Sequence, residues 1–341
     1  MKFLSIIIPS YNSEKTILPL LASVESSEGI SFEEMELIIV DDGSGDGTVA
    51  AIEHFFSVHR RHVKTVRIIQ LAKNVGPAKA RNIGAKYAKG TIILFLDADI
   101  RVYPKTIREV VRSFRDDADL YALTGVWDKK QKSNRFFRKF KALRDWSYWL
   151  YERDPKNYYY LFSTRVAAID RGLFMRLGGF NQSYRAALVE DIELTYRIAR
   201  RHAVIFNPKV IVHHEFEDFI PVAKKYFWRS YYWSQIYRKR KKFDPVATTA
   251  KEALTGMTAG VLTLMAIVFS LSYVSHIGLL REMGLITGAV FLIHLWCVRH
   301  FLWFCAKEEG VWFAIKSFFT GIVLYLIIIA GTLYSWIKET P

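Results

Sequence analysis

About the last quarter of the sequence consists of three long apolar runs, and these limit what the chain can fold into. The runs extend over about Ala253–Ser275, Met283–Phe304 and Val311–Ile337, separated by Arg281-Glu282 and Lys307-Glu308-Glu309. Each reaches the roughly 20 residues that a helix needs to cross a bilayer. Helices of a soluble bundle should instead be amphipathic. The sequence therefore predicts a membrane domain with about three transmembrane helices over residues 251–341.

The second apolar run is the weakest of the three because it contains His294, Arg299 and His300. Ionisable side chains are costly inside a bilayer unless they reach an interface. Three spans would leave the C-terminus outside the cell and two would leave it inside; we expect three. The basic run Arg238–Lys242 stands just before the first apolar run. This placement predicts an integral membrane protein whose N-terminal domain lies on the cytoplasmic face.

Basic and aromatic residues are mixed in two stretches that precede the apolar runs. Residues 219–250 are predicted to form a basic-aromatic, amphipathic interfacial segment, and residues 128–160 either an irregular surface helix or a second interfacial segment. The chain carries a net charge of +15. Basic chains bind nucleic acids or anionic membrane lipids. The apolar runs, with no zinc knuckle or arginine-rich tail, favour membrane lipids as partners and argue against nucleic acid.

The first hundred residues alternate short apolar stretches with helix-like stretches. Strands are predicted at 3–8, 36–40, 66–70 and 92–96, and helices at 13–24, 48–58 and 78–88. This alternation predicts parallel βαβ units with right-handed crossovers, and hence an α/β domain over residues 1–218. The rest of this domain is expected to contain a helix from Pro104 to Arg115, strands at 120–126 and 164–170, helices at 171–177 and about 189–201, and short strands at 203–207 and 210–212.

The predicted strand at 92–96 ends in two acids one residue apart, Asp97 and Asp99. Polar residues also follow the three earlier strands, at Tyr11, Asp42 and Asn74. Because open α/β sheets bind their ligands at the carboxyl ends of the strands, we expect these residues to converge on one crevice. Neighbouring carboxylates suit a divalent cation that shares phosphate oxygens.

Six motifs occur in a fixed order: IIIPSYN at 6–12, VDDGS at 40–44, NVGPAKARNIG at 74–84, FLDAD at 95–99, GGF at 178–180 and VEDIEL at 189–194. Each motif is short, but their order and spacing together resemble those of the inverting family 2 glycosyltransferases. The resemblance covers about residues 3–215. It implies the GT-A fold, a Rossmann-like, mostly parallel sheet flanked by helices. It also implies a nucleotide-diphosphate sugar as donor, with UDP as the expected nucleotide and GDP and dTDP as the alternatives.

The resemblance assigns a donor site to the polar loops. Tyr11 would stack on the base, and Asp41 and Asp42 would accept hydrogen bonds from base or ribose. Arg81 would offer its fork of N–H donors to ribose, base or phosphate. The complete predicted donor site comprises Pro9, Tyr11, Asp41, Asp42, Asn74, Gly76, Arg81, Asp97 and Ala98.

A divalent cation, Mg²⁺ or Mn²⁺, is implied at the motif Asp97-Ala98-Asp99, where it would neutralise charge on the leaving diphosphate. Asp99 is the expected direct ligand, and Asp97 is a second metal candidate that we expect to contact ribose or the donor sugar. Family members often add a late histidine, for which His213 and His214 are the candidates. Because neighbouring residues of a strand point to opposite faces, only one should face the site, and we favour His213.

The pair Glu190-Asp191 matches the acidic pair of the family at a helix start. Asp191, with Glu190 beside it, is the predicted catalytic base. It would deprotonate an acceptor hydroxyl while that oxygen attacks the anomeric carbon. One displacement inverts that carbon. The motif Gly178-Gly179-Phe180 is expected to let the chain pass close to the donor sugar or the acceptor.

The sequence predicts a membrane-anchored enzyme that transfers one sugar to a lipid-linked or membrane-proximal glycan acceptor. It lacks the Gln-X-X-Arg-Trp motif of processive synthases, since residues 229–233 read RSYYW, so a non-processive enzyme is expected. The alternative is a polyprenyl-phosphate sugar synthase, whose lipid phosphate would need basic residues such as Arg135, Arg138, Lys139 and Arg229. An inactive membrane scaffold is a remote third reading, because the acids Asp97, Asp99 and Asp191 are all present.

Overall fold

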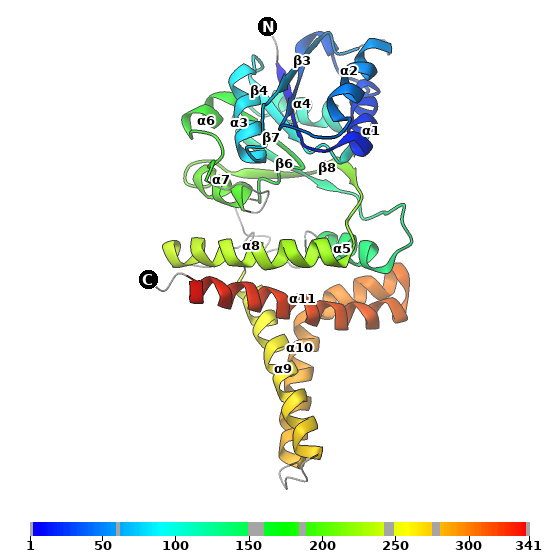
Figure 1. Cartoon of the computed structure of the whole chain (residues 1–341), viewed down its shortest axis with the longest axis vertical. Helices are drawn as coiled ribbons and strands as arrows, with labels where there is room; N and C mark the ends of the chain where they lie inside the picture. Colours follow the sequence, from blue (N-terminus) through cyan, green and yellow to red (C-terminus); the bar gives the residue numbers. More distant parts are fainter. Residues whose placement is uncertain are drawn as a thin grey trace. The chain divides into compact units, whose positions relative to one another are not determined.

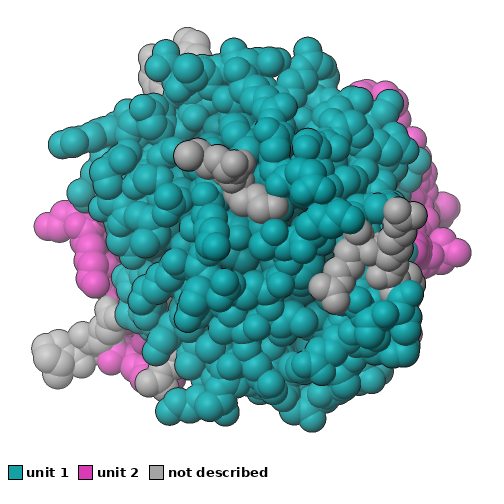
Figure 2. All heavy atoms as spheres, turned by 90° about the horizontal axis from the view of Figure 1, so that it is seen from above, with its two compact units in different colours: residues 1–130, 156–215 teal, residues 131–155, 216–341 magenta. Residues whose placement is uncertain are grey.

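The computed structural model describes residues 3–58, 62–148, 160–183, 189–241, 249–274 and 280–338. The chain divides into two compact units, coloured separately in Figure 2. After the functions predicted above, we name residues 1–130 and 156–215 the catalytic unit, and residues 131–155 and 216–341 the membrane unit. Part of the predicted interfacial stretch at 128–160 thus groups with the C-terminal part of the chain.

Four parallel strands form one half of the sheet in the catalytic unit, in the order β3-β2-β1-β4 (Figure 1). The strands are β1 (Leu4–Ser10), β2 (Met35–Asp41), β3 (Thr65–Gln70) and β4 (Ile92–Leu96). The connecting helices are α1 (Glu14–Glu25), α2 (Thr48–Val58) and α3 (Pro77–Tyr87). Every one of these elements begins and ends within two residues of its predicted position. The prediction of parallel βαβ units is therefore confirmed.

The other half of the sheet is largely antiparallel. Strand β7 (Val166–Asp170) pairs antiparallel with β4 and with β6 (Ala122–Trp127), and β8 (Val204–His214) runs parallel to β6. A short strand that was not predicted, β5 (Ile100–Val102), pairs antiparallel with β8. The whole sheet is thus mixed, in the order β3-β2-β1-β4-β7-β6-β8-β5, and the α/β fold class is confirmed.

The two short strands predicted at 203–207 and 210–212 are one continuous strand, β8. The prediction was wrong because Asn207-Pro208 reads as a break in the sequence. In the structure, a register shift between Thr124 and Val126 of β6 accommodates this irregularity. Gly125 lies at the shift, where an added Cβ would come 2.1 Å from the carbonyl oxygen of Val210.

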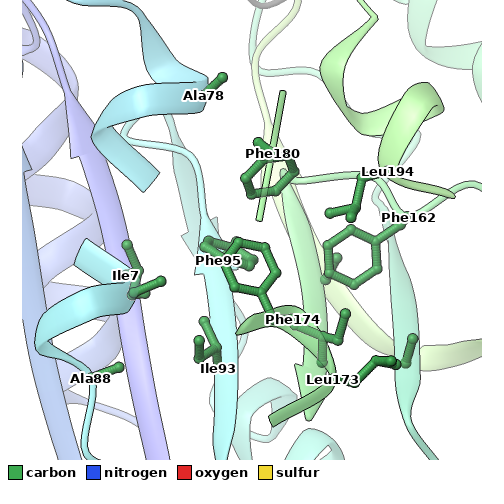
Figure 3. Close-up of a cluster of buried hydrophobic side chains, with 14 of the residues drawn as sticks. Ile7, Ala78, Ala88, Ile93, Phe95, Phe162, Leu173, Phe174, Phe180 and Leu194 are labelled. Carbon is green, nitrogen blue, oxygen red and sulfur yellow. The ribbon is translucent and has the colours of Figure 1, made fainter. Parts of the chain in front are cut away.

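Aromatic side chains fill the core directly behind the end of β4 (Figure 3). The ring of Phe95 lies 5.3 Å from that of Phe174, 5.2 Å from that of Phe180 and 6.3 Å from that of Phe162, centroid to centroid. All four rings are buried, and such packing adds to the free energy gained by burial. Because Phe95 is two residues before Asp97, this cluster fixes the position of the acids that follow it.

The described part of the catalytic unit also contains the helices α4 (Thr106–Asp116), α6 (Arg171–Arg176) and α7 (Glu190–Ile198) and the short 3₁₀ helix η1 (Phe32–Glu34). The described part of the membrane unit contains α5 (Phe136–Ser147), α8 (Phe219–Arg240), α9 (Ala250–Val274), α10 (Leu280–Glu309) and α11 (Val311–Lys338). Helices α9, α10 and α11 are each long and apolar enough to cross a membrane, as the three apolar runs predict. Helices α5, α8, α10 and α11 share one apolar cluster built around Phe140, Val222 and Phe304.

Candidate active site

The loops after β1 and β2 are tied together by side-chain hydrogen bonds. The backbone N–H of Asn12 donates to Ser44 Oγ at 2.9 Å, and that of Gly45 donates to Asn12 Oδ1 at 2.9 Å. Asn12 adopts a left-handed backbone conformation with φ of 48°, which asparagine tolerates better than most residues. The neighbouring Tyr11 remains 50% exposed, so its ring is available to a planar ligand.

Asp41, the last residue of β2, and Asp42, which follows it, are buried and hold these loops in place. Asp41 accepts hydrogen bonds from the backbone N–H and the hydroxyl of Ser44, at 3.1 and 2.5 Å. Asp42 accepts from the backbone N–H groups of Val75 and Gly76, at 2.7 and 2.9 Å. Burial raises the pKa of Asp42, and these two N–H groups oppose that shift. Both carboxylates therefore organise the rim of the site from inside the protein.

The loop after β3 leads into α3 through Gly76, whose φ of 90° favours glycine. Asn74 is exposed at this loop, beside the backbone groups that Asp42 fixes. Pro77 occupies the first turn of α3, where its missing N–H costs nothing. This helix start positions two buried polar side chains one turn later, Arg81 and Asn82.

Arg81 joins the two acidic motifs of the chain. Its guanidinium is 2% exposed; Nη2 lies 2.6 Å from Asp97 Oδ1, and Nη1 lies 3.1 Å from Glu190 Oε1. Burial lowers the pKa of Arg81, but the charges of Asp97 and Glu190, with a smaller contribution from Asp191, outweigh it and raise the pKa overall. We expected this guanidinium to contact the donor, whereas both of its terminal nitrogens contact carboxylates.

The two acids of the motif after β4 have different surroundings. Asp97 accepts from Arg81, and Ala98 is buried between the two acids. Asp99 is more open, with a side chain that is 53% exposed. Its Oδ2 lies 3.4 Å from Nε2 of His214. The more open carboxylate is thus the one that stands beside an imidazole.

The pairing of β5 with β8 decides which histidine stands beside Asp99. Ile100 lies opposite His214 and Arg101 opposite His213, so the two histidines point to opposite faces of the sheet, as expected for a strand. His213 Nε2 lies 2.8 Å from Glu215 Oε1 instead. We expected His213 to face the site, and this register corrects that expectation. Only the structure shows which face of the sheet carries Asp99.

The side chains around Asp99 can be compared with the ligands that a divalent metal ion requires. Among the residues that the structure describes, no three His, Cys, Asp or Glu side chains lie close enough together to hold a metal by themselves. Asp99 and His214 offer a carboxylate and an imidazole. Mg²⁺ and similar ions are bound by one or two such side chains together with substrate phosphates and water. The pair fits a cation that arrives with a diphosphate.

The two acids at the start of α7 also have different surroundings. Glu190 is buried against Arg81. Asp191 is half-buried, and its Oδ1 accepts from the backbone N–H of Ile192 at 2.8 Å. Residues 184–188, just before this pair, lie outside the described part of the chain. Of the two acids, Asp191 is therefore the more exposed.

Asn82 fixes the glycine turn and was not among the predicted site residues. Its Nδ2 donates to the carbonyl of Phe180 at 2.8 Å, and its Oδ1 accepts from the N–H of Phe180 at 2.9 Å. Gly178 and Gly179 have φ of 77° and 70°, and a Cβ at Gly179 would meet Asn82 Oδ1 at 2.4 Å. Arg197 of α7 holds the same turn, donating to Gly179 O at 2.7 Å. The sequence signal for Asn82 was its place in the motif at 74–84, beside Arg81, and we find no such signal for Arg197.

Comparisons with known proteins extend this description. The family model described as "Glycosyl transferase family 2" matches residues 5–192, more than half of the chain. The dodecaprenyl-phosphate galacturonate synthase of Rhizobium johnstonii is 30% identical over 192 residues, which are 56% of this chain and 50% of that protein. The poly(ribitol-phosphate) beta-N-acetylglucosaminyltransferase TarS of Staphylococcus aureus is 35% identical over 130 residues, 37% of this chain and 22% of TarS.

A third relative is the undecaprenyl-phosphate 4-deoxy-4-formamido-L-arabinose transferase of Proteus mirabilis, which is 31% identical over 135 residues, 40% of this chain and 39% of that protein. The chain thus matches half or less of the length of these curated relatives.

The fold is shared with a solved structure, the mannosyltransferase PcManGT from Pyrobaculum calidifontis in complex with GDP-Man and Mn²⁺. The two chains superpose with a TM-score of 0.66 at 19% identity, over 98% of this chain and 87% of that one. The superposition shows a shared GT-A fold, and the family match shows that this chain belongs to glycosyl transferase family 2.

Proposed function

We propose that this family 2 enzyme is a membrane-anchored inverting glycosyltransferase that moves one sugar from a nucleotide-diphosphate sugar to a lipid-linked or membrane-proximal glycan acceptor. The observation that carries the proposal is the bridge made by Arg81. It joins Asp97, at the end of β4, to Glu190, at the start of α7 and 109 residues from Arg81. The acids predicted for metal binding and for catalysis therefore belong to one site.

The donor nucleotide is proposed to bind over the loops after β1, β2 and β3. The exposed ring of Tyr11 offers a stacking face to the base, and Asn74 is exposed for polar contacts. Pro9 precedes this loop, and Asp41 and Asp42 keep it in shape through the hydrogen bonds described above. UDP is the proposed nucleotide.

A divalent cation, Mg²⁺ or Mn²⁺, is proposed to be held by Asp99 and His214 together with the donor diphosphate. When bound, such an ion neutralises the charge that develops on the leaving diphosphate. Asp97 is a weaker candidate for a ligand because its Oδ1 already accepts from Arg81 at 2.6 Å. The proposed role of Asp97 is to balance the positive charge of Arg81 and to hold in position the loop that contains Asp99.

Asp191 is proposed to act as the general base. It takes the proton of an acceptor hydroxyl while that oxygen forms a bond to the anomeric carbon of the donor sugar. The bond between this carbon and the diphosphate oxygen breaks in the same step, and the electron pair leaves with the nucleotide diphosphate. Glu190 pairs with Arg81 and holds the first turn of α7. A single displacement from the opposite side inverts the anomeric carbon.

A polyprenyl phosphate is the second candidate acceptor. Two of the relatives, named as a dodecaprenyl-phosphate synthase and an undecaprenyl-phosphate transferase, support it. The basic residues expected to bind such a phosphate give less support. Arg135 and Arg138 both pair with Asp218, and Lys139 pairs with Glu309 at 2.9 Å. These ion pairs would have to be exchanged for contacts with the lipid phosphate.

The proposal is tested by nucleotide release from a panel of UDP-, GDP- and dTDP-sugars, using the full chain in nanodiscs with Mn²⁺ or Mg²⁺. Asp191→Asn should lower turnover by at least about 100-fold, because a positioned base contributes 10²–10⁴-fold. Donor binding, measured by calorimetry, should be unchanged. The exposed Asp117→Asn is the control. Full turnover by the Asp191 variant would remove it as the base.

The acceptor is tested separately with a radiolabelled donor sugar. Transfer to a lipid-linked glycan, with none to bare polyprenyl phosphate, supports the main proposal and eliminates the second candidate. Transfer to bare polyprenyl phosphate reverses that choice. No release from any donor, together with no donor binding, would support the inactive scaffold instead.

A further inference from the structure

Helix α11 is long and apolar enough to cross a membrane, yet its contacts within the membrane unit are not those of a crossing helix. A helix that crosses a bilayer has its ends at the two surfaces and its middle in the hydrocarbon core. The start, the middle and the end of α11 each stand beside charged side chains of neighbouring helices.

The start of α11 lies next to α5. Glu309, two residues before α11, pairs with Lys139 of α5 at 2.9 Å. The ring of Phe313 lies 4.8 Å from that of Phe136, in the first turn of α5. Gly310, with φ of 92°, is the single residue between α10 and α11, and it permits the chain to change direction there.

The middle of α11 lies next to the first turn of α9. The hydroxyl of Tyr325 donates to Glu252, in the first turn of α9, at 2.7 Å. The guanidinium of Arg144 in α5 lies 4.8 Å from the centre of the same ring. A charged residue at the start of a membrane helix marks the membrane surface, because charge is costly further in. Tyr325 therefore lies at the surface, although it is near the centre of its own helix.

The end of α11 lies against the end of α8. Arg238 donates to Ser335 Oγ at 3.0 Å, and its guanidinium lies 5.0 Å from the ring of Trp336. Between these points, Gly331 packs so closely that an added Cβ would come 2.3 Å from the carbonyl oxygen of Phe227. In Figure 1, α8 and α11 accordingly run side by side, while α9 and α10 extend away from them as a hairpin.

Helix α8 cannot itself cross a bilayer. It contains six Lys and Arg residues and no acid. Since α11 packs side by side with α8, the axes of both helices have the same tilt relative to the membrane. The outer face of α11 carries an apolar stripe at helical spacing, with the exposed Lys316 at its edge, and the stripe suits contact with acyl chains. This stripe comprises Trp312, Ile315, Phe319, Val323, Leu326, Ala330, Leu333 and Ile337.

We infer that α11 lies flat in the membrane surface beneath α8, and that the α9–α10 hairpin alone crosses the bilayer. The hairpin is long enough for this. Gly260 of α9 contacts Ile329 of α11, and α9 continues from there to Val274, a rise of roughly 20 Å. The diameter of α11 adds about 10 Å, which reaches the roughly 30 Å of a hydrocarbon core. The C-terminal end of α11 then lies on the same side of the membrane as the catalytic unit.

Labelling of single cysteines in sealed membrane vesicles tests this topology. The background replaces the two native cysteines, Cys297 and Cys305, with alanine. A membrane-impermeant maleimide is then applied to Glu53→Cys in the catalytic unit, Arg281→Cys at the tip of the hairpin and Lys338→Cys at the end of α11. All three positions are exposed. The measurement does not depend on activity, so its outcome is separate from that of the proposed function.

We expect Glu53→Cys and Lys338→Cys to be labelled in vesicles of one orientation and Arg281→Cys in vesicles of the other. Labelling of Lys338→Cys together with Arg281→Cys would show that α11 crosses the membrane and would overturn the inference. Labelling of all three from one side would overturn the crossing of the hairpin. Inverted vesicles supply the matched control, because every position must exchange its accessibility in them.

Discussion

The catalytic unit and the membrane unit differ in how they use charge to join segments that are distant in the sequence. In the catalytic unit, Arg81, Glu190 and Asp42 are almost completely buried, and each is satisfied by a segment far away in the sequence. In the membrane unit, the buried Lys141 pairs with Asp145 four residues later in the same helix, and the long-range pair of Arg135 and Asp218 is open to water. There, apolar rings and close glycine contacts hold the helices together.

This difference teaches which contacts fix the geometry of each unit. Breaking a buried ion pair leaves an uncompensated charge and is strongly destabilising, whereas an exposed pair contributes little. The active site should therefore depend on its charges, and the membrane unit on its packing. The following changes test that contrast.

The largest effect is expected from Arg81→Ala. This change leaves Glu190 buried without its cation and should lower the free energy of unfolding by about 3–5 kcal/mol, with loss of turnover. Unfolding of the full chain in detergent measures it. The control is Arg112→Ala, because Arg112 pairs with Asp116 at the surface, where both side chains are 63% exposed. Its effect should be about 0.5 kcal/mol or less.

Arg81→Lys sharpens this test. A single ammonium group cannot reproduce the fork that reaches both Asp97 and Glu190. We expect the lysine variant to remain folded but less stable than the parent. Equal stability of the two would show that bridging both acids is unnecessary.

The next largest effect is expected from Gly179→Ala, with Gly178→Ala as its matched control. Both positions have positive φ, which costs an alanine about 1–2 kcal/mol. Only at Gly179 would the new methyl group also displace Asn82, which then loses hydrogen bonds to Phe180. Gly179→Ala should therefore cost at least about 1 kcal/mol more in unfolding free energy. Equal losses of unfolding free energy in the two variants would show that the hydrogen bonds of Asn82 do not hold this turn.

In the membrane unit, Gly331→Ala and Gly321→Ala should act in opposite directions. Alanine is a better helix former than glycine by about 1 kcal/mol. Nothing lies within 4 Å of a Cβ at Gly321, so this variant should be more stable in detergent. A Cβ at Gly331 meets Phe227 and Ser230 at 2.3 Å, and overpacking of this kind costs about 1–3 kcal/mol. A rise in the melting temperature of both variants would show that α11 is not packed tightly on α8.

The smallest effect is expected from Asp218. Its hydrogen bond from Arg138, followed by that from Arg135, lowers the pKa of this carboxyl below its ordinary value of 3.8. The ionised form is therefore favoured in the folded protein. The resulting stability is present above the ordinary pKa and is lost as pH falls through the lowered one.

Asp218→Asn should remove this acid-dependent contribution, and salt should weaken the contribution in the parent because the pair is exposed. Melting temperatures between pH 6 and pH 3, at low and high salt, measure it. Identical acid dependence of parent and variant would show that the pair does not stabilise the contact between α5 and α8.

The sequence was sufficient for the parallel half of the sheet. Apolar runs such as the one at β4 are bounded by glycine, proline and acids, which fixes both their type and their ends. The position of the site followed from the same pattern, because polar residues come directly after these strands. The antiparallel half was harder, since β5 has only three residues and β8 contains Asn207-Pro208.

The sequence by itself thus determined that an α/β domain precedes three long apolar helices, and which loops carry the polar residues, because these depend on local periodicity. Only the tertiary structure decided that Arg81 bridges two acids, that His214 and not His213 stands beside Asp99, and that α11 packs along α8. These three facts depend on strand register and on contacts between distant segments. Such contacts are set by packing in three dimensions, and local sequence carries no record of them.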